Sequence, residues 1–322
     1  MFEAFPVYIH FIVILTAMIG LGRGAHYLVE GAAGIAKRFG VSELIVGLTV
    51  VAMGTSAPEF MVTLLAALKG VGDVSVGNIA GSNVFNLGII LGLLALYRPL
   101  QTSRELLMRD TAVHILAASL LFGLAGFDFY FGRLEGGVFL LLFFAYLFIL
   151  FKKGKSSAED LPVHEEIVQV SFKRAAFETV GGISIVLLCS QLLLSSSIVV
   201  ARSFGMSEWL IGVTIVAAGT SLPELVTAIV SIIKKRHDIG IGNLIGSDIF
   251  NILGVLGLTA LFKPIAIQPI AQISLAGLLG MSVLLAIFMR TGWRLSRREG
   301  FILLVFALLR WGVDIFGAEN LF

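Results

Sequence analysis

The chain contains a single cysteine, Cys189, among its 322 residues. One thiol cannot form a disulfide within the chain, and it cannot supply a thiolate metal site. Histidines are also few, and their positions show no spacing typical of metal ligands: His10, His26, His114, His164 and His237. The sequence therefore argues against soft-metal chemistry and gives no sign of a resident cofactor.

Charged residues are equally scarce. They make up 14% of the chain, whereas 57% of the residues are hydrophobic and the mean hydropathy is +0.98. A soluble domain needs more polar cover than this composition provides. The apolar runs are about 20 residues long, the length of a helix across a bilayer core. We therefore expect an all-α polytopic membrane protein with about ten transmembrane helices, at residues 7–30, 43–68, 74–97, 108–125, 132–151, 175–201, 208–233, 239–262, 270–289 and 299–317.

The few basic residues predict the orientation. If ten spans start outside, 17 lysines and arginines fall on the cytoplasmic side and five on the opposite side, with Arg23 inside a span. The positive-inside rule then places both termini outside the cell membrane and the polar segment 152–174 in the cytoplasm. No basic residue precedes the first apolar run, so we expect that span to be retained rather than cleaved. Topology explains the basic clusters without a nucleic-acid partner, and no obligate protein partner is indicated.

Two segments of the chain are copies of each other. Residues 39–100 and 204–265 align without a gap at an offset of 165, and 27 of the 62 aligned positions are identical. Five predicted spans separate the copies, so the second enters the membrane from the opposite side. The sequence predicts an inverted repeat, the architecture of alternating access, with five-helix halves at 1–151 and 175–322 joined by a linker at 152–174.

The first repeated motif is Gly-Thr-Ser-x-Pro-Glu, at 54–59 and 219–224. Glycine and proline this close together break a helix in the middle of a span. Broken backbone in a membrane is tolerated only where it faces protein or a water-filled cavity, so the break predicts a site. We expect carbonyls that lose their helical partners, near Ala52 and Ala217, to face a cation there. Hydroxyl oxygens would come from Thr55, Ser56, Thr220 and Ser221.

The same motif also fits a helix cap, in which Ser56 pairs with Glu59 and Ser221 with Glu224. An ionised carboxylate in mid-membrane, however, costs about 2.5 kcal/mol or more unless a positive charge compensates it. The motif contains no basic residue. We therefore predict that both glutamates are cation ligands, with capping as a possible second role of the serines.

The second repeated motif, Gly-Asn-x-x-Gly-Ser-x-x-Phe-Asn, begins at Gly77 and again at Gly242. Its polar residues are spaced four apart and share one helical stripe. The glycines form the small-residue pattern that lets membrane helices approach closely. We expect Ser82, Asn86, Ser247 and Asn251 to line the site. For Asn78 and Asn243, lining the site and binding helices together remain equal alternatives.

Two carboxylates with hydroxyl, amide and carbonyl oxygens form a ligand set for hard cations. Calcium takes six to eight oxygen ligands in flexible geometry, and two glutamates match the charge of one divalent ion. Without calcium, the same pair needs sodium ions or protons in its place, which is the logic of an antiporter.

At these two motifs the sequence resembles the calcium/cation antiporter superfamily, most closely its prokaryotic-type sodium/calcium exchangers. The resemblance implies four central sites, with Glu59 and Glu224 shared between calcium and sodium. Thr55, Thr220 and the carbonyls of Ala52 and Ala217 would complete the ligand sets. The resemblance also implies that sodium is bound by four serines, Ser56, Ser221, Ser82 and Ser247. It further implies that the first and sixth spans form a long pair that slides across the core to switch access.

Three features bear on coupling. Asn251 is neutral where some relatives carry aspartate, which argues against potassium cotransport. The Gly-Asn-x-x-Glu pattern usual in the proton-coupled branch is absent. Arg23, His26 and Glu30 can share one face of the first span. We expect a structural Arg23–Glu30 pair there, with a protonatable group that modifies coupling as the alternative.

The lead hypothesis is thus sodium/calcium antiport, and the alternative is calcium/proton antiport through the same fold. An intramembrane enzyme is disfavoured because a nucleophilic serine needs a neighbouring base and an orienting group. A channel is disfavoured because inverted copies build two alternating paths rather than one continuous pore.

Overall fold

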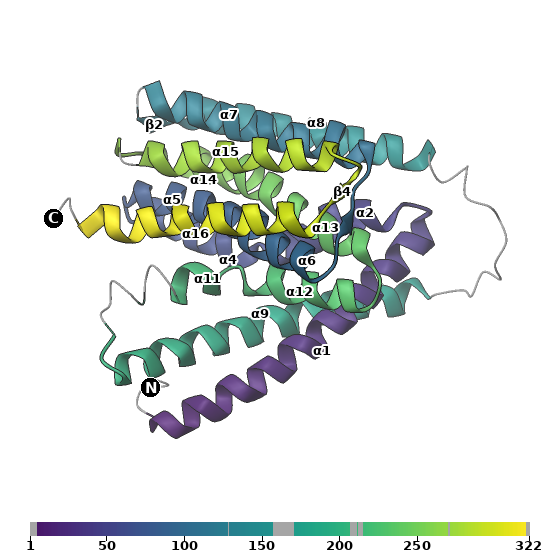
Figure 1. Cartoon of the computed structure of the whole chain (residues 1–322), viewed down its shortest axis with the longest axis horizontal. Helices are drawn as coiled ribbons and strands as arrows, with labels where there is room; N and C mark the ends of the chain where they lie inside the picture. The colour runs from purple at the N-terminus through teal and green to yellow at the C-terminus, as the bar shows by residue number, and fades with distance from the viewer. Residues whose placement is uncertain are drawn as a thin grey trace.

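The computed structural model describes residues 5–127, 129–156, 171–206, 211, 215–269 and 271–319, and they form a bundle of helices (Figure 1). Four two-residue strands are the only extended elements in these ranges. The all-α prediction is confirmed. Within the predicted linker, residues 157–170 lie outside the described part; the helices on either side reach Ser156 and begin at Phe172.

Each half of the chain supplies a similar series of helices, some with π-helical segments (η). The first half contains α1 (Val7–Phe39), α2 (Glu43–Val46), η2 (Gly47–Val51), α3 (Ala52–Thr55), α4 (Ala57–Leu68), α5 (Gly72–Val84), η3 (Phe85–Ile90), α6 (Leu91–Tyr97), η4 (Leu106–Thr111), α7 (Ala112–Phe127) and α8 (Arg133–Ser156). The second half contains α9 (Phe172–Ser203), α11 (Ala217–Gly219), α12 (Leu222–Ile233), α13 (His237–Ile249), η6 (Phe250–Leu256), α14 (Gly257–Phe262), α15 (Ala271–Arg290) and α16 (Arg297–Glu319).

The number of spans agrees roughly with the prediction. In the described ranges, seven helical segments are long and apolar enough to cross a membrane, and the bent pair Glu43–Thr55 with Ala57–Leu68 adds an eighth. Two further predicted spans, 208–233 and 299–317, correspond to α12 and α16. Residues 208–210 and 212–214 of the former lie outside the described part.

The strands join the two halves in a symmetric way. Strand β1 (Leu100–Gln101) pairs antiparallel with β4 (Arg294–Leu295), and β2 (Tyr130–Phe131) pairs antiparallel with β3 (Ile265–Ala266). Strands β1 and β3 are 165 residues apart, which is the offset of the sequence repeat. Each pair therefore links one half to the other, as a pseudo-two-fold axis between inverted repeats requires.

The helices that carry the second motif form the centre of the bundle. In an apolar 18-residue stretch of Gly72–Tyr97 and of His237–Phe262, 72% and 83% of the residues are buried, against 22% and 17% in such stretches of α1 and α9. Glycine permits the close packing. A Cβ atom on Gly246 would lie 2.5 Å from the Leu48 carbonyl oxygen. The predicted close approach of helices at this motif is confirmed for the second copy.

Helices α1 and α9 form a separate long pair along one side of the bundle (Figure 1). Their backbones approach closely at glycines. A Cβ atom on Gly31 would lie 2.5 Å from the Thr179 amide nitrogen, and one on Gly182 would lie 2.4 Å from the Leu28 amide nitrogen. These two helices are the first and sixth predicted spans, and they begin at equivalent positions of the repeat.

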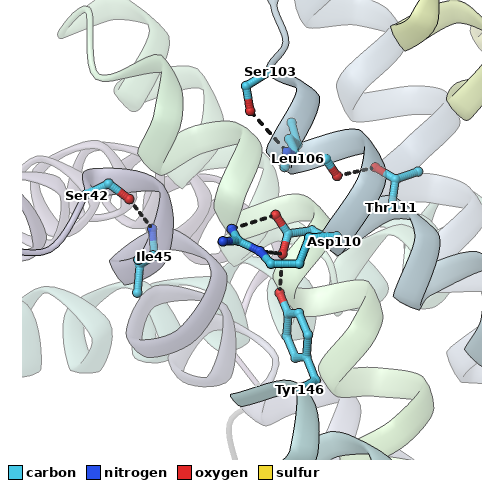
Figure 2. Close-up of polar contacts among 8 residues, drawn as sticks. Ser42, Ile45, Ser103, Leu106, Asp110, Thr111 and Tyr146 are labelled. Atoms are coloured by element: carbon cyan, nitrogen blue, oxygen red, sulfur yellow. Dashed lines mark hydrogen bonds and ion pairs between the residues drawn. The ribbon is translucent and has the colours of Figure 1, made fainter. Parts of the chain in front are cut away.

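Serine side chains cap the N-termini of two of the shorter helical segments. The Ser42 hydroxyl accepts a hydrogen bond from the Ile45 amide at 3.3 Å and caps α2. The Ser103 hydroxyl accepts one from the Leu106 amide at 3.0 Å, just before η4 (Figure 2). Both satisfy amides that have no partner in the first turn of a helix.

Asp110 shows how this fold holds a buried carboxylate outside the repeated motifs. Its side chain is fully buried. Arg109 donates to both of its oxygens, at 2.8 and 3.0 Å, and the Tyr146 hydroxyl donates to Oδ1 at 3.0 Å (Figure 2). A fixed cation and a hydroxyl together compensate this charge.

The predicted Arg23–Glu30 pair is wrong. The Glu30 carboxylate pairs instead with Lys234 at 2.5 Å and Arg236 at 3.9 Å, just beyond the end of α12. The Lys234 ammonium also lies 3.4 Å from His26 Nε2. The partners of Glu30 lie in the turn between α12 and α13, far along the chain, which the periodicity of the first span alone does not reveal.

The close contact of α1 with α9 gives a prediction with a matched control. Gly31→Ala places a methyl group against the α9 backbone, and overpacking of this kind costs about 1–3 kcal/mol. Gly22→Ala makes the same change in the same helix where no atom of the described structure lies within 4 Å. We expect thermal unfolding in detergent to show a lower melting temperature for Gly31→Ala than for Gly22→Ala. Equal melting temperatures would contradict the packing described.

Candidate functional site

The first motif breaks a helix in both halves, as predicted. Ser56 has φ −80° and ψ 12° between α3 and α4, and Ser221 has φ −89° and ψ 11° between α11 and α12. The first break bends its helix pair by 48°. Pro58 lies in the first turn of α4, and because proline has no N–H, the carbonyl of Gly54 has no helical donor.

The two glutamates of the motif lie buried at these breaks, with 1% of Glu59 and none of Glu224 exposed. The Ser56 hydroxyl donates to Glu224 Oε1 at 3.0 Å, and the Ser221 hydroxyl donates to Glu59 Oε1 at 3.2 Å. Each serine therefore holds the glutamate of the opposite repeat. Both carboxyl groups therefore lie at the interface between the two repeats.

The capping role of the two serines is wrong. Neither Ser56 nor Ser221 makes a side-chain cap hydrogen bond to its own helix. Their hydroxyls are used across the repeat interface instead. The sequence pattern of a capping box is present, but here a buried acceptor on the other half competes successfully for each donor.

Further hydroxyls of the predicted set surround Glu224. Ser247 donates to Glu224 Oε1 at 3.3 Å and lies 3.5 Å from the Thr55 hydroxyl. Thr55 in turn donates to Asn243 Oδ1 at 3.0 Å. Its repeat counterpart Thr220 is buried at the second break. The structure thus brings residues of both motifs and both repeats to one place.

The Ala52 carbonyl keeps its helical partner, contrary to expectation. It accepts from the Ser56 amide at 3.1 Å, and the Thr55 and Ser247 hydroxyls lie 3.3 and 3.4 Å from it. The helical hydrogen bond of this carbonyl is kept because its donor, the amide N–H of Ser56, precedes Pro58, where the N–H is missing. Ala217 begins α11 at the equivalent position, and its side chain lies outside the described part.

The amides of the second motif have different roles. Asn78 donates to the Glu59 carbonyl at 3.3 Å and to the Thr63 hydroxyl at 3.0 Å, so it links α5 to α4 as the helix-binding alternative predicts. Asn251 donates to the Ser82 hydroxyl at 3.5 Å. Ser82 itself donates to its own helix at the Ile79 carbonyl, and within the described ranges no hydrogen bond links it to either glutamate.

Asp248 is a buried carboxyl that sequence analysis missed. It is fully buried on α13, and its Oδ1 accepts from Asn86 Nδ2 at 2.9 Å. It is close enough to Glu224 for their charges to interact. Its counterpart in the first repeat is Asn83. The sequence signal that could have revealed it is this difference: the position is neutral in the first copy of the motif and acidic in the second.

Several buried oxygen atoms of the site have no hydrogen-bond donor among the described residues: Glu59 Oε2, Glu224 Oε2, Asn86 Oδ1 and Asn251 Oδ1. A buried acceptor left without a partner costs about 1–3 kcal/mol. Carboxylate and amide oxygens of this kind are what a hard cation such as calcium or sodium requires. The chemistry of the site therefore favours cation binding.

Comparison with known proteins supports this chemistry. A sequence model of the family described as sodium/calcium exchanger protein matches residues 9–152 and 176–310. The chain belongs to the sodium/calcium exchanger family. The resemblance read from the two motifs is confirmed, and the family is one of antiporters rather than enzymes.

Individual relatives match over nearly the whole length of the exchanger chain. It is 38% identical to CaxA of Alkalimonas amylolytica, over 91% of this chain and 95% of that protein. It is 33% identical to the sodium/calcium exchanger MaX1 of Methanosarcina acetivorans, over 92% and 96%. The solved structure of the sodium-calcium exchanger NCX_Mj soaked with zero Na⁺ and Ca²⁺ superposes with a TM-score of 0.82 at 29% identity, over 94% of this chain and 98% of that one.

The crossed serine–glutamate contacts give a prediction for this exchanger. Ser56→Ala and Ser221→Ala each remove the donor to one carboxylate while leaving its helix break intact. We expect each to weaken calcium binding about tenfold, the usual effect of losing a hydrogen bond to a metal ligand. Isothermal titration of the purified protein with calcium measures this. Ser184→Ala is the control, because the Ser184 hydroxyl donates only within its own exposed helix turn; binding equal to this control would disprove the role of the crossed contacts.

Proposed function

We propose that this chain is a secondary antiporter that exchanges sodium for calcium across the cell membrane by alternating access. The observation that carries the proposal is the pair of buried carboxylates, Glu59 and Glu224, each held by a serine of the opposite repeat. Membership of the exchanger family and the likeness to MaX1 and NCX_Mj support it.

We propose that the two glutamates are shared by calcium and sodium. Oxygen atoms of the two motifs complete the ligand set around them: Thr55, Thr220, Ser56, Ser221, Ser82, Ser247, Asn86, Asn251 and the carbonyls of Ala52 and Ala217. To bind a cation, the Ala52 carbonyl would use its second lone pair, which the Thr55 and Ser247 hydroxyls face in this structure.

Exchange follows from competition for the same two carboxylates. Their negative charges balance one calcium ion, and within the described contacts no lysine, arginine or histidine pairs with either of them. Leaving both charged and buried without a cation is costly. Release of calcium is therefore favourable only when sodium replaces it. Each ion drives transport through its different affinity for the outward-facing and inward-facing states.

The inverted repeats supply the two states. The halves 1–151 and 175–322 would exchange conformations about the pseudo-two-fold axis, with 152–174 as a cytoplasmic linker and both termini outside. The α1–α9 pair is the least buried of the spanning elements. Glycines at the two helix breaks lie against side chains of α9, and this smooth contact suits an element that slides past a fixed core.

Calcium/proton antiport is the second candidate. The observation in its favour is that Glu59 and Glu224 are buried carboxyls with only hydroxyl donors around them. A proton on each would neutralise the pair as well as sodium ions would. The two candidates share the site and differ only in the ion that replaces calcium.

Gradients imposed on proteoliposomes separate these candidates. We expect purified protein to take up labelled calcium when vesicles are loaded with sodium and diluted into sodium-free buffer at constant pH. A pH gradient without sodium should drive little uptake. Uptake that follows the pH gradient and ignores sodium would overturn the sodium proposal and establish the proton alternative.

Neutral variants test the two glutamates directly. We expect Glu59→Gln and Glu224→Gln to abolish sodium-driven calcium uptake, since each removes one of the two charges that balance calcium. Both variants should remain folded because the amide keeps a carbonyl oxygen to accept from the serine. Glu178→Gln is the control, because Glu178 pairs with the exposed Arg174 on the surface of α9. Exchange retained in either site variant would contradict the assignment.

A further inference from the structure

The two repeats differ at one buried position of the second motif. Asn83 in α5 and Asp248 in α13 occupy equivalent places, between an identical Gly-Ser and an identical Phe two residues later. Both side chains are fully buried. Neither belongs to the ligand set proposed above, so their burial beside it needs an explanation.

Their contacts cross from one repeat to the other. Asp248 Oδ1 accepts from Asn86 Nδ2 at 2.9 Å, and Asn83 Oδ1 accepts from Asn251 Nδ2 at 3.3 Å. Each residue therefore holds the amide nitrogen of the opposite repeat's asparagine. Asn83 Nδ2 in turn donates to the Asp248 backbone carbonyl at 3.2 Å, which fixes how the Asn83 amide is turned.

These contacts determine which end of each asparagine amide is left for a ligand. Asp248 Oδ1 accepts from Asn86 Nδ2, so the nitrogen end of the Asn86 amide is turned toward Asp248. The oxygen of Asn83 likewise faces the nitrogen of Asn251. The remaining oxygens, Asn86 Oδ1 and Asn251 Oδ1, are buried and have no donor among the described residues.

We propose that Asp248 and Asn83 are positioning residues, which turn the amide oxygens of Asn86 and Asn251 toward the transported cation. The proposal rests on the exchange function proposed above. Without these acceptors an amide can rotate by half a turn and present its NH₂ group, which repels a cation. Outer partners that orient ligands in this way set the affinity of a metal site without touching the metal.

The acceptor atom, rather than the negative charge, carries this role. Asn83 performs it in the first repeat with no charge. Asp248 differs from it in being a carboxyl group, and its Oδ2 lies 3.9 Å from Nε2 of the buried His114. A neutral residue that keeps an acceptor at position 248 should therefore preserve most of the function.

Four variants in proteoliposomes test the proposal, each assayed for sodium-driven calcium uptake over a range of calcium concentrations. Asp248→Ala and Asn83→Ala remove the acceptor. We expect each to raise the half-saturating calcium concentration by about 10- to 100-fold, with the maximal rate largely kept. Asp248→Asn keeps an acceptor and should lie closer to wild type than to Asp248→Ala. Ser282→Ala, which removes a buried hydroxyl that donates only to the Leu278 carbonyl of α15, is the control.

The outcomes separate this inference from the proposed function. Wild-type protein that shows no sodium-driven uptake would refute the function itself. Wild-type exchange with an unchanged half-saturating concentration in Asn83→Ala would refute the positioning role alone. Equal losses in Asp248→Asn and Asp248→Ala would show that charge matters and would also refute it. A fall in maximal rate without a change in half-saturation would indicate structural damage and count against the proposal; if Asp248→Ala fails to fold, Asn83→Ala and Asp248→Asn decide.

Discussion

The fold depends on a crossed pair of hydrogen bonds, from Ser56 to Glu224 and from Ser221 to Glu59. Each buried glutamate takes a hydroxyl donor from the opposite half, which ties the two repeats together at their helix breaks. The same crossing recurs in the second motif, where Asn83 and Asp248 hold the opposite asparagines. Duplication of one segment thus produced a site in which the contacts of both motifs join one repeat to the other.

The contrast with Asp110 supports the transport role proposed for this pair. Asp110 is as deeply buried, but Arg109 and Tyr146 compensate it with atoms of the chain itself. Glu59 and Glu224 have hydroxyl donors and no fixed cation among the described residues. Asp110, balanced by its own arginine, is a structural element, whereas the two glutamates would be balanced by a transported ion. In the function proposed here, antiport follows from that need, because an empty site with two uncompensated charges is costly.

The repeated segments and the positions of the helix breaks could be predicted from the sequence alone. The breaks at 54–59 and 219–224, the close glycine packing at Gly246 and the burial of both glutamates follow from residue type and the membrane's demand for satisfied backbone. Prediction from the sequence failed where the partner lies far along the chain. Glu30 was paired with Arg23 on its own helix, although Lys234 is the true partner. Ser56 and Ser221 fit a local cap, yet a distant carboxylate takes their hydroxyls. Asp248 lies at a position where the two copies differ, and identities between the copies therefore do not reveal it; its difference from Asn83 is the informative feature.

Calcium's position in a crystal structure, located by its anomalous scattering, tests the central claim most directly. The account predicts one calcium ion bound by both Glu59 and Glu224, at about 2.3–2.6 Å from oxygen atoms of each carboxylate. A calcium ion bound elsewhere, or to one glutamate with the other turned toward lipid, would contradict it.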